Sequence, residues 1–136
     1  GCSRARQDVL ELSRLLAEKF PLDPKRSVLA GFSQGGGLAI ELGLSGDLPV
    51  VGVLALSPYL TQLPVTASSR PGIWISRGER DYKTEQFERI AQWLEQLGIR
   101  HHLESYPELG HDFPPDFPSA LAQALAFLLG ENYPNQ

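Results

Sequence analysis

Residues 27–37, SVLAGFSQGGG, decide the fold, because they join a strand to a helix through a serine flanked by glycines. Ser27 to Phe32 is short, almost wholly apolar and bounded by charge and glycine, which is typical of a strand buried in a parallel sheet. A helix is expected from Gln34 to Leu44, closing at Gly46. The stretch therefore predicts a strand, a sharp turn at Ser33 and a helix.

The same alternation extends to both sides of this unit. Apolar residues at helical spacing predict an amphipathic helix from about Ala5 to Lys19, and the remaining expected elements are strands at 50–56, 73–76 and 102–106, helices at 82–97 and 120–129, and a loop at 59–71. The strand at 102–106 is short and polar, which favours a sheet edge. We therefore expect an α/β fold of about four strands in an open parallel sheet, with helices on both faces. A chain of 136 residues has room for a single domain, residues 1–136.

Composition excludes several classes of function. The net charge is −4 and no segment concentrates lysine and arginine, so nucleic acid is not expected as a partner. The single cysteine, Cys2, excludes an internal disulfide and a cysteine-based metal site, and it fits a cytoplasmic location. No apolar run approaches the ~20 residues that a membrane span needs, and no signal peptide opens the chain.

The turn between strand and helix carries the pattern G-x-S-x-G, from Gly31 to Gly35. Such a turn holds the serine backbone in a strained conformation, and side chains at Gly31 and Gly35 are expected to collide across it. The serine hydroxyl is then exposed at the carboxyl end of the strand, beside the positive end of the following helix dipole. The backbone N–H of Gln34 is expected to donate to an oxyanion that forms on a substrate carbonyl.

An ordinary glycine-rich turn that binds phosphate is the alternative interpretation. A phosphate-binding loop of the Walker type needs G-K-[ST] at the start of the helix, and this chain has Gly36-Gly37-Leu38 there.

A serine nucleophile needs a histidine as its base and a carboxylate to orient that histidine. In α/β-hydrolases the three residues follow the chain order Ser, acid, His. Asp81 lies just beyond the strand at 73–76, and His111 follows the strand at 102–106. Because loops at the carboxyl edge of a parallel sheet converge, Ser33, Asp81 and His111 are expected to meet there.

Other residues compete for these roles. Glu79 stays open as an alternative acid, because it lies two residues nearer the strand end than Asp81. Asp112 is expected to form a turn with the proline-containing loop that follows it. His101 and His102 stand at the start of a strand, opposite the expected site, and are interpreted as surface residues. Both tryptophans, Trp74 and Trp93, are expected in the core.

Together these motifs resemble the phospholipase/carboxylesterase group of α/β-hydrolases, which includes the acyl-protein thioesterases. The resemblance covers residues 5–130 and is carried by GFSQGG at 31–36, LSP at 56–58, the pair Gly78-x-x-Asp81 and the dipeptide Gly110-His111. It implies Ser33 as nucleophile, Asp81 as acid, His111 as base and the Gln34 N–H as an oxyanion donor. It implies no cofactor and no metal. Arg77 stands where the family often has a histidine.

The resemblance also implies strands before the nucleophile strand, where this chain has one amphipathic helix. The four expected strands correspond to the carboxyl-terminal part of a truncated α/β-hydrolase fold. The strand that carries Ser33 is then expected at an open edge with unpaired backbone groups. The usual second oxyanion donor is also missing, and losing one such donor typically costs about 10²–10³ in rate.

The sequence thus predicts a serine hydrolase that cleaves carboxylic esters or thioesters through an acyl-enzyme. The alternative is a truncated or inactive hydrolase-like domain that acts as a binding or assembly module. A homodimer paired through the open edge is a third hypothesis. Leu60, Leu63, Phe113 and Phe117 favour an apolar acyl group, and Leu60 and Phe113 are the residues predicted to bind the substrate.

Overall fold

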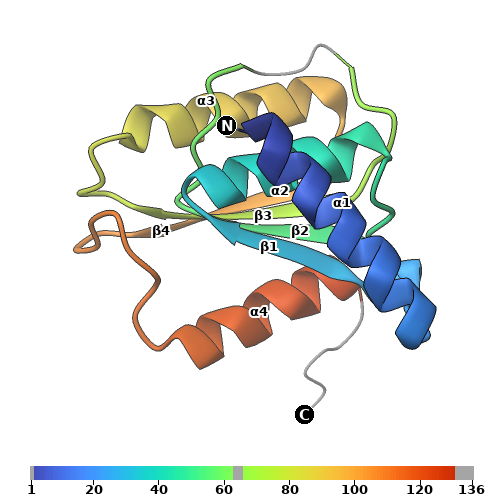
Figure 1. Ribbon diagram of the computed structural model, residues 1–136. Coiled ribbons are helices and arrows are strands. Elements are labelled where there is room, and N and C mark those ends of the chain that lie inside the picture. Colours follow the sequence, from blue (N-terminus) through green and yellow to red (C-terminus); the bar gives the residue numbers. More distant parts are fainter. Residues whose placement is uncertain (1, 63–65, 131–136) are drawn as a thin grey trace.

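The computed structural model of the chain describes residues 2–62 and 66–130 (Figure 1). In chain order they form α1 (Cys2–Lys19), a short 3-10 helix η1 (Pro24–Arg26), β1 (Val28–Phe32), α2 (Gln34–Ser45), β2 (Gly52–Leu56), β3 (Gly72–Gly78), α3 (Thr84–Leu97), β4 (His101–Tyr106) and α4 (Phe117–Leu129). Leu63, expected beside the substrate, lies outside the described residues.

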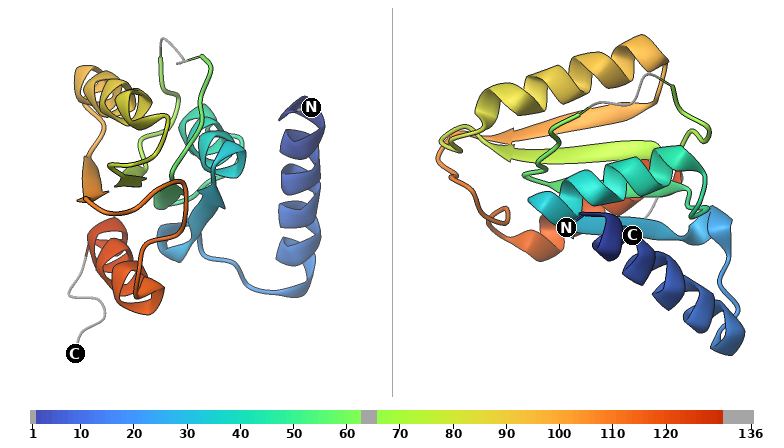
Figure 2. Two further views of the ribbon diagram at one scale, coloured as in Figure 1. Left: turned by 90° about the vertical axis from the view of Figure 1, so that its left-hand side faces the viewer. Right: turned by 45° about the horizontal axis from the view of Figure 1, so that its top comes forward.

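The four strands form one parallel sheet in the order β1-β2-β3-β4. Helices α2 and α3 cover one face and α4 covers the other (Figures 1 and 2). This arrangement confirms the expected open α/β sheet with helices on both faces, and it confirms β4 as an edge strand. Because the strands are parallel, the turns after β1, β3 and β4 all lie at the same edge of the sheet.

Several boundaries differ from those expected. Strand β3 extends to Gly78 instead of stopping at Ser76. Helix α4 begins at Phe117 rather than Ala120, with Pro118 in its first turn. A proline is tolerated there because the first N–H groups of a helix have no intrahelical partner. The prolines of this segment are therefore the reason why the sequence did not predict the first turn of α4.

The core has two layers, one on each side of the sheet. Between the sheet and α2 and α3 it contains Ile40, Leu44, Val53, Ile73, Ile75, Ile90, Trp93 and Leu94. On the α4 side it contains Leu54, Leu56, Trp74, Ala124 and Leu128. Both tryptophans are buried, as expected. Burial of both faces accounts for the continuous apolar sequence of β2.

The β1 side is much more open. Among the described residues β1 pairs only with β2, so its other edge carries the unpaired backbone groups that the sequence predicts. In the left-hand view of Figure 2, α1 stands apart from the sheet, and Leu12 and Phe20 are each 56% exposed. An ion pair between Arg6 and Asp47 links α1 to the turn after α2. No helix within residues 2–62 and 66–130 is long and apolar enough to cross a membrane.

Candidate active site

The turn from β1 to α2 holds Ser33 in a strained conformation, with φ 58° and ψ −120°. L-residues rarely adopt a positive φ, because the side chain then crowds the backbone. A Cβ atom at Gly31 would lie 2.2 Å from the carbonyl oxygen of Gly35, so only glycine fits at position 31. The expected collision at Gly35 is wrong: a Cβ atom there would meet nothing within 4 Å.

Backbone hydrogen bonds fix this strained turn from the sheet side. The N–H of Ser33 donates to the carbonyl oxygen of Leu56 over 2.9 Å. The carbonyl oxygen of Ser33 accepts from Gly37 N–H at 3.1 Å and from Tyr59 N–H at 2.9 Å. Strand β2 and the loop after it therefore hold the position of Ser33.

The structure brings Ser33, His111 and Asp81 into one hydrogen-bonded chain. His111 Nε2 lies 3.0 Å from Ser33 Oγ, and His111 Nδ1 lies 2.7 Å from Asp81 Oδ2. The Asp81 side chain is 0% exposed, and its other carboxylate oxygen accepts from Lys83 N–H at 2.9 Å. Both oxygens of the buried carboxylate are therefore satisfied, which burial of a charge requires.

This arrangement sets the tautomer of the imidazole. A carboxylate only accepts hydrogen bonds, so Nδ1 of His111 carries the proton. Nε2 then presents its lone pair to the Ser33 hydroxyl, which donates to it. A histidine held in this way can take a proton from serine as the serine attacks a carbonyl carbon.

The loops that carry Asp81 and His111 are joined by their backbones. The N–H of Glu79 donates to the Tyr106 carbonyl at 3.0 Å, and the N–H of Arg80 donates to the Leu109 carbonyl at 2.9 Å. A Cβ atom at Gly78 would lie 2.1 Å from the Leu109 carbonyl oxygen, so this approach needs a glycine. The sequence shows Gly78 as part of a motif, but it does not predict this close approach to Leu109, because the two residues lie far apart in the chain.

The competing acidic residues lie elsewhere. Glu79 is exposed, whereas Asp81 supplies the oxygen that contacts His111 Nδ1. Asp112 Oδ1 accepts from Phe113 N–H at 2.7 Å, forming the local turn expected of it.

The other two histidines lie at the opposite end of β4 from the triad, as expected from the sequence. Their side chains are partly buried rather than fully on the surface. His101 Nδ1 donates to the Ile99 carbonyl, and His102 packs on Trp74 with ring centroids 4.3 Å apart and pairs with Glu104.

Gln34 is the first residue of α2, immediately after Ser33. The first N–H groups of a helix have no intrahelical acceptor, so the N–H of Gln34 is available to a ligand. The positive end of the helix dipole lies at the same place. The position is compatible with the oxyanion donor that the sequence predicts.

One side of the triad is bordered by three aromatic residues, Phe32, Phe113 and Phe117, which we call the phenylalanine rim. The Phe32 ring lies 4.9 Å from the His111 ring, and Phe113 stacks on Phe32 at 5.0 Å. Phe117 meets Phe113 edge-on at 5.3 Å. Phe113, predicted to bind substrate, is 44% exposed and so presents apolar surface beside the triad.

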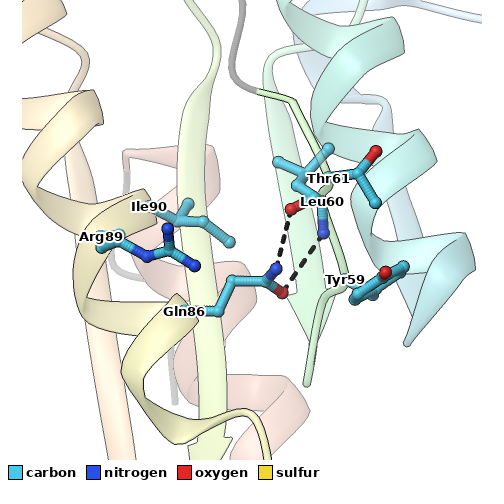
Figure 3. Close-up of a pocket in the computed structure, with 6 residues that line it drawn as sticks. All are labelled: Tyr59, Leu60, Thr61, Gln86, Arg89 and Ile90. Carbon is cyan, nitrogen blue, oxygen red and sulfur yellow. Dashed lines mark hydrogen bonds between the residues drawn. The ribbon is translucent and has the colours of Figure 1, made fainter.

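The other predicted substrate residue, Leu60, lies mostly in the core, 5% exposed. Its backbone N–H and carbonyl are both paired with the amide of Gln86, at 3.3 and 2.8 Å (Figure 3). What remains exposed lines a hollow of about 490 Å³ between α3 and the loop after β2, together with Tyr59, Thr61, Gln86, Arg89 and Ile90. Leu60 is therefore a wall of this hollow rather than a neighbour of Phe113.

A second border, the cationic rim, consists of Tyr59, Tyr82 and Lys83. The Lys83 ammonium lies 3.2 Å from the centroid of the Tyr59 ring and 5.2 Å from that of Tyr82. The Tyr82 ring, 74% exposed, meets the ring of His111 edge-on at 5.3 Å. Sequence reasoning missed this rim, although two of its members directly follow Asp81. Within the described ranges, no group of three or more His, Cys, Asp or Glu is placed to hold a metal ion.

Comparisons with known proteins bear on the family and the fold. The phospholipase/carboxylesterase family matches residues 4–129. An acyl-protein thioesterase 1 of Gibberella zeae is 31% identical over 103 residues, which are 68% of this chain and 44% of that protein.

Solved structures show the same fold. The esterase PE8 superposes with a TM-score of 0.80 at 27% identity, over 94% of this chain and 60% of that one. An uncharacterized protein from Bacillus cereus superposes with a TM-score of 0.84 at 24% identity, over 93% of this chain and 43% of that one. The chain thus spans less than half the length of the curated relative that it matches.

Proposed function

The chain belongs to the phospholipase/carboxylesterase family of α/β-hydrolases, and on that premise we propose that it is a serine hydrolase that cleaves carboxylic esters or thioesters through Ser33, His111 and Asp81. The observation that carries the proposal is the unbroken hydrogen-bonded chain from the buried Asp81 carboxylate through His111 to the Ser33 hydroxyl. The strained backbone of Ser33 supports it, since strain of this kind is retained where the fold holds a nucleophile in place.

The reaction proceeds in two halves. His111 Nε2 takes the proton of Ser33 Oγ as the oxygen bonds to the substrate carbonyl carbon. The carbonyl oxygen becomes an oxyanion that accepts from the Gln34 N–H, and the protonated His111 gives its proton to the departing alcohol or thiol. Water then attacks the acyl-enzyme with His111 again as base, which releases the acid and restores Ser33. Asp81 stabilises the imidazolium throughout.

The substrate is a small-molecule ester or thioester with an apolar acyl group. Phe113 offers exposed aromatic surface beside His111, and this surface suits an acyl chain. Leu60 contributes as a wall of the neighbouring hollow. Residues 1–136 act as one domain, because the described elements share a single sheet. A cytoplasmic location is supported by the single cysteine.

The proposal is tested with 4-nitrophenyl butyrate as substrate. The Ser33→Ala variant should lose hydrolysis and labelling by a fluorophosphonate probe, because no other residue replaces the attacking oxygen. Ser119→Ala, which removes a hydroxyl from the exposed first turn of α4, is the matched control and should retain both. Equal turnover by wild type and the Ser33→Ala variant would contradict the proposal.

A second candidate function is favoured by the open side of the molecule. The free edge of β1 lies next to a groove of about 420 Å³ between α1 and the sheet, lined in part by Leu10, Leu22, Val28 and Val50. Such a side suits a truncated or inactive hydrolase-like domain that pairs its edge with a second copy in a homodimer. A folded protein that resists the fluorophosphonate probe and has a dimeric mass in solution would favour this function. A labelled monomer would exclude it.

A further inference from the structure

The two rims of the site differ in chemistry. The phenylalanine rim is apolar, whereas the cationic rim places an ammonium group between two tyrosine rings. Both rims contact His111, the phenylalanine rim through Phe32 and the cationic rim through Tyr82. The difference between the rims therefore bears on which substrates fit.

Within the described residues the Lys83 ammonium has no carboxylate partner. Neighbouring cations of the same loop and strand are paired: Arg77 with Glu88 at 3.0 Å and Arg80 with Glu108 at 2.7 Å. Within the described residues no carboxylate lies at ion-pair distance from Lys83, and the contacts of its ammonium are the faces of Tyr59 and Tyr82. An aromatic face attracts a cation and leaves its remaining N–H donors free for an anion.

The position of this cation is tied to the triad by the backbone. The N–H of Lys83 donates to the Asp81 carboxylate at 2.9 Å, and the N–H of Tyr59 donates to the Ser33 carbonyl at 2.9 Å. Tyr82 connects the rim to His111 through the edge-on ring contact. The backbone of Lys83 and its two tyrosine partners are thus each connected to a residue of the triad.

Arg89 adds positive charge farther along the same side. It faces Tyr59 across the hollow in Figure 3, from α3 toward the loop after β2. Tyr59 thus contacts the Lys83 ammonium and shares a hollow with Arg89, while Glu41 lines a smaller hollow with Tyr59 and Thr61.

We propose that Lys83 binds an anionic group, a carboxylate or phosphate, of the ester or thioester substrate, while the apolar part of the substrate lies against the phenylalanine rim. The inference rests on the proposed function and narrows its substrates to esters that carry both an apolar part and a negative charge. A neutral ester leaves the ammonium without an anion, so it loses the charge-assisted hydrogen bond. Lys83 is in this sense a specificity-determining residue.

The test uses two matched pairs of esters that differ only in charge. Mono-4-nitrophenyl glutarate and 4-nitrophenyl glutaramate, its terminal amide, place the charge on the acyl side. The 4-carboxyphenyl and 4-carbamoylphenyl butyrates place it on the leaving side. In at least one pair the ratio of kcat/KM, charged over neutral, should fall about three- to tenfold in the Lys83→Gln variant, the scale of one partly exposed ion pair.

Two control variants separate a local contact from a general charge effect. Lys83→Arg should retain the ratio, because it keeps the cation. Lys25→Gln removes an equal charge from η1, at the opposite edge of the sheet, and should leave every ratio unchanged. The pair that responds shows which side of the scissile bond faces Lys83. Ratios in Lys83→Gln equal to those of wild type in both pairs would overturn the inference.

A binding measurement keeps this result separate from the proposed catalysis. In a Ser33→Ala background, NMR titration should show the charged ester of the responding pair bound about three- to tenfold more weakly once Lys83→Gln is added. If wild type hydrolyses none of the esters, no pair can be singled out by kinetics, so both pairs are titrated against the Ser33→Ala protein. Absence of Ser33-dependent turnover would contradict the serine hydrolase proposal, while a Lys83-dependent difference in binding would still support the anion site. Equal binding of charged and neutral esters by the Ser33→Ala protein, together with Ser33-dependent turnover by wild type, would overturn only the anion site.

Discussion

Helices α1 and α3 carry the same amphipathic pattern but bury it to very different extents. On α3 the residues Phe87, Ile90 and Leu94 are 0% exposed, while Leu12 on α1 and Phe20 just after it are each 56% exposed. Figure 2 shows the same contrast, with α3 against the sheet and α1 apart from it. A periodic pattern therefore predicts a helix and its apolar face, but tertiary packing decides whether that face is covered.

The candidate site lies across the boundary between these two sides. Asp81 and Lys83 precede the well-packed helix α3, whereas Ser33 directly follows β1, the strand whose outer edge is unpaired among the described residues. On the packed side, the Ser33 N–H donates to the Leu56 carbonyl and the Tyr59 N–H donates to the Ser33 carbonyl. The geometry of the triad is thus fixed mainly by the α3 side, and the predictions below test that asymmetry.

The largest expected effect is a loss of kcat on substitution of Asp81, which lies on the packed α3 side. Asp81→Asn replaces an acceptor by an amide that can donate to Nδ1 and favours the wrong imidazole tautomer, so kcat should fall by about 10⁴. Steady-state kinetics on 4-nitrophenyl butyrate measure it. Glu79→Gln, a matched change two residues away on an exposed side chain, should change kcat less than about twofold. A large loss in Glu79→Gln with activity retained in Asp81→Asn would reverse the assignment.

The proximity of Ser33, Asp81 and His111 could be predicted because each follows a strand of a parallel sheet. Their convergence follows from topology alone, so Ser33, Asp81 and His111 needed no knowledge of side-chain packing. Tyr59 and Lys83 were missed because their contact depends on the conformation of two loops. The exposure of Leu12 could not be predicted either, because the helical pattern does not show which elements pack against the helix.

The second prediction compares the two helices directly. Phe87→Ala should lower the free energy of unfolding by about 3–5 kcal/mol, because it leaves a cavity in the core between α3 and the sheet. Phe20→Ala, just beyond α1, should lower it by less than about 1 kcal/mol, since its ring is already mostly in water. Urea denaturation followed by circular dichroism gives both values. Similar losses in the two variants would mean that the apolar face of α1 is covered in solution.

The smallest expected effect is a difference in stability between substitutions at Gly31 and at Gly35, the two glycines that flank the turn at Ser33. Gly31→Ala forces a Cβ atom against the Gly35 carbonyl and should destabilise the protein by about 1–3 kcal/mol, with a loss of turnover as Ser33 shifts. Gly35→Ala meets no atom within 4 Å and gains helix propensity in the first turn of α2, so it should stabilise by up to about 1 kcal/mol. Denaturation midpoints and kcat for both variants measure the difference. If Gly35→Ala were as damaging as Gly31→Ala, the space beside Gly35 would have to be filled in solution. That result would contradict the difference between the two flanks of the turn at Ser33.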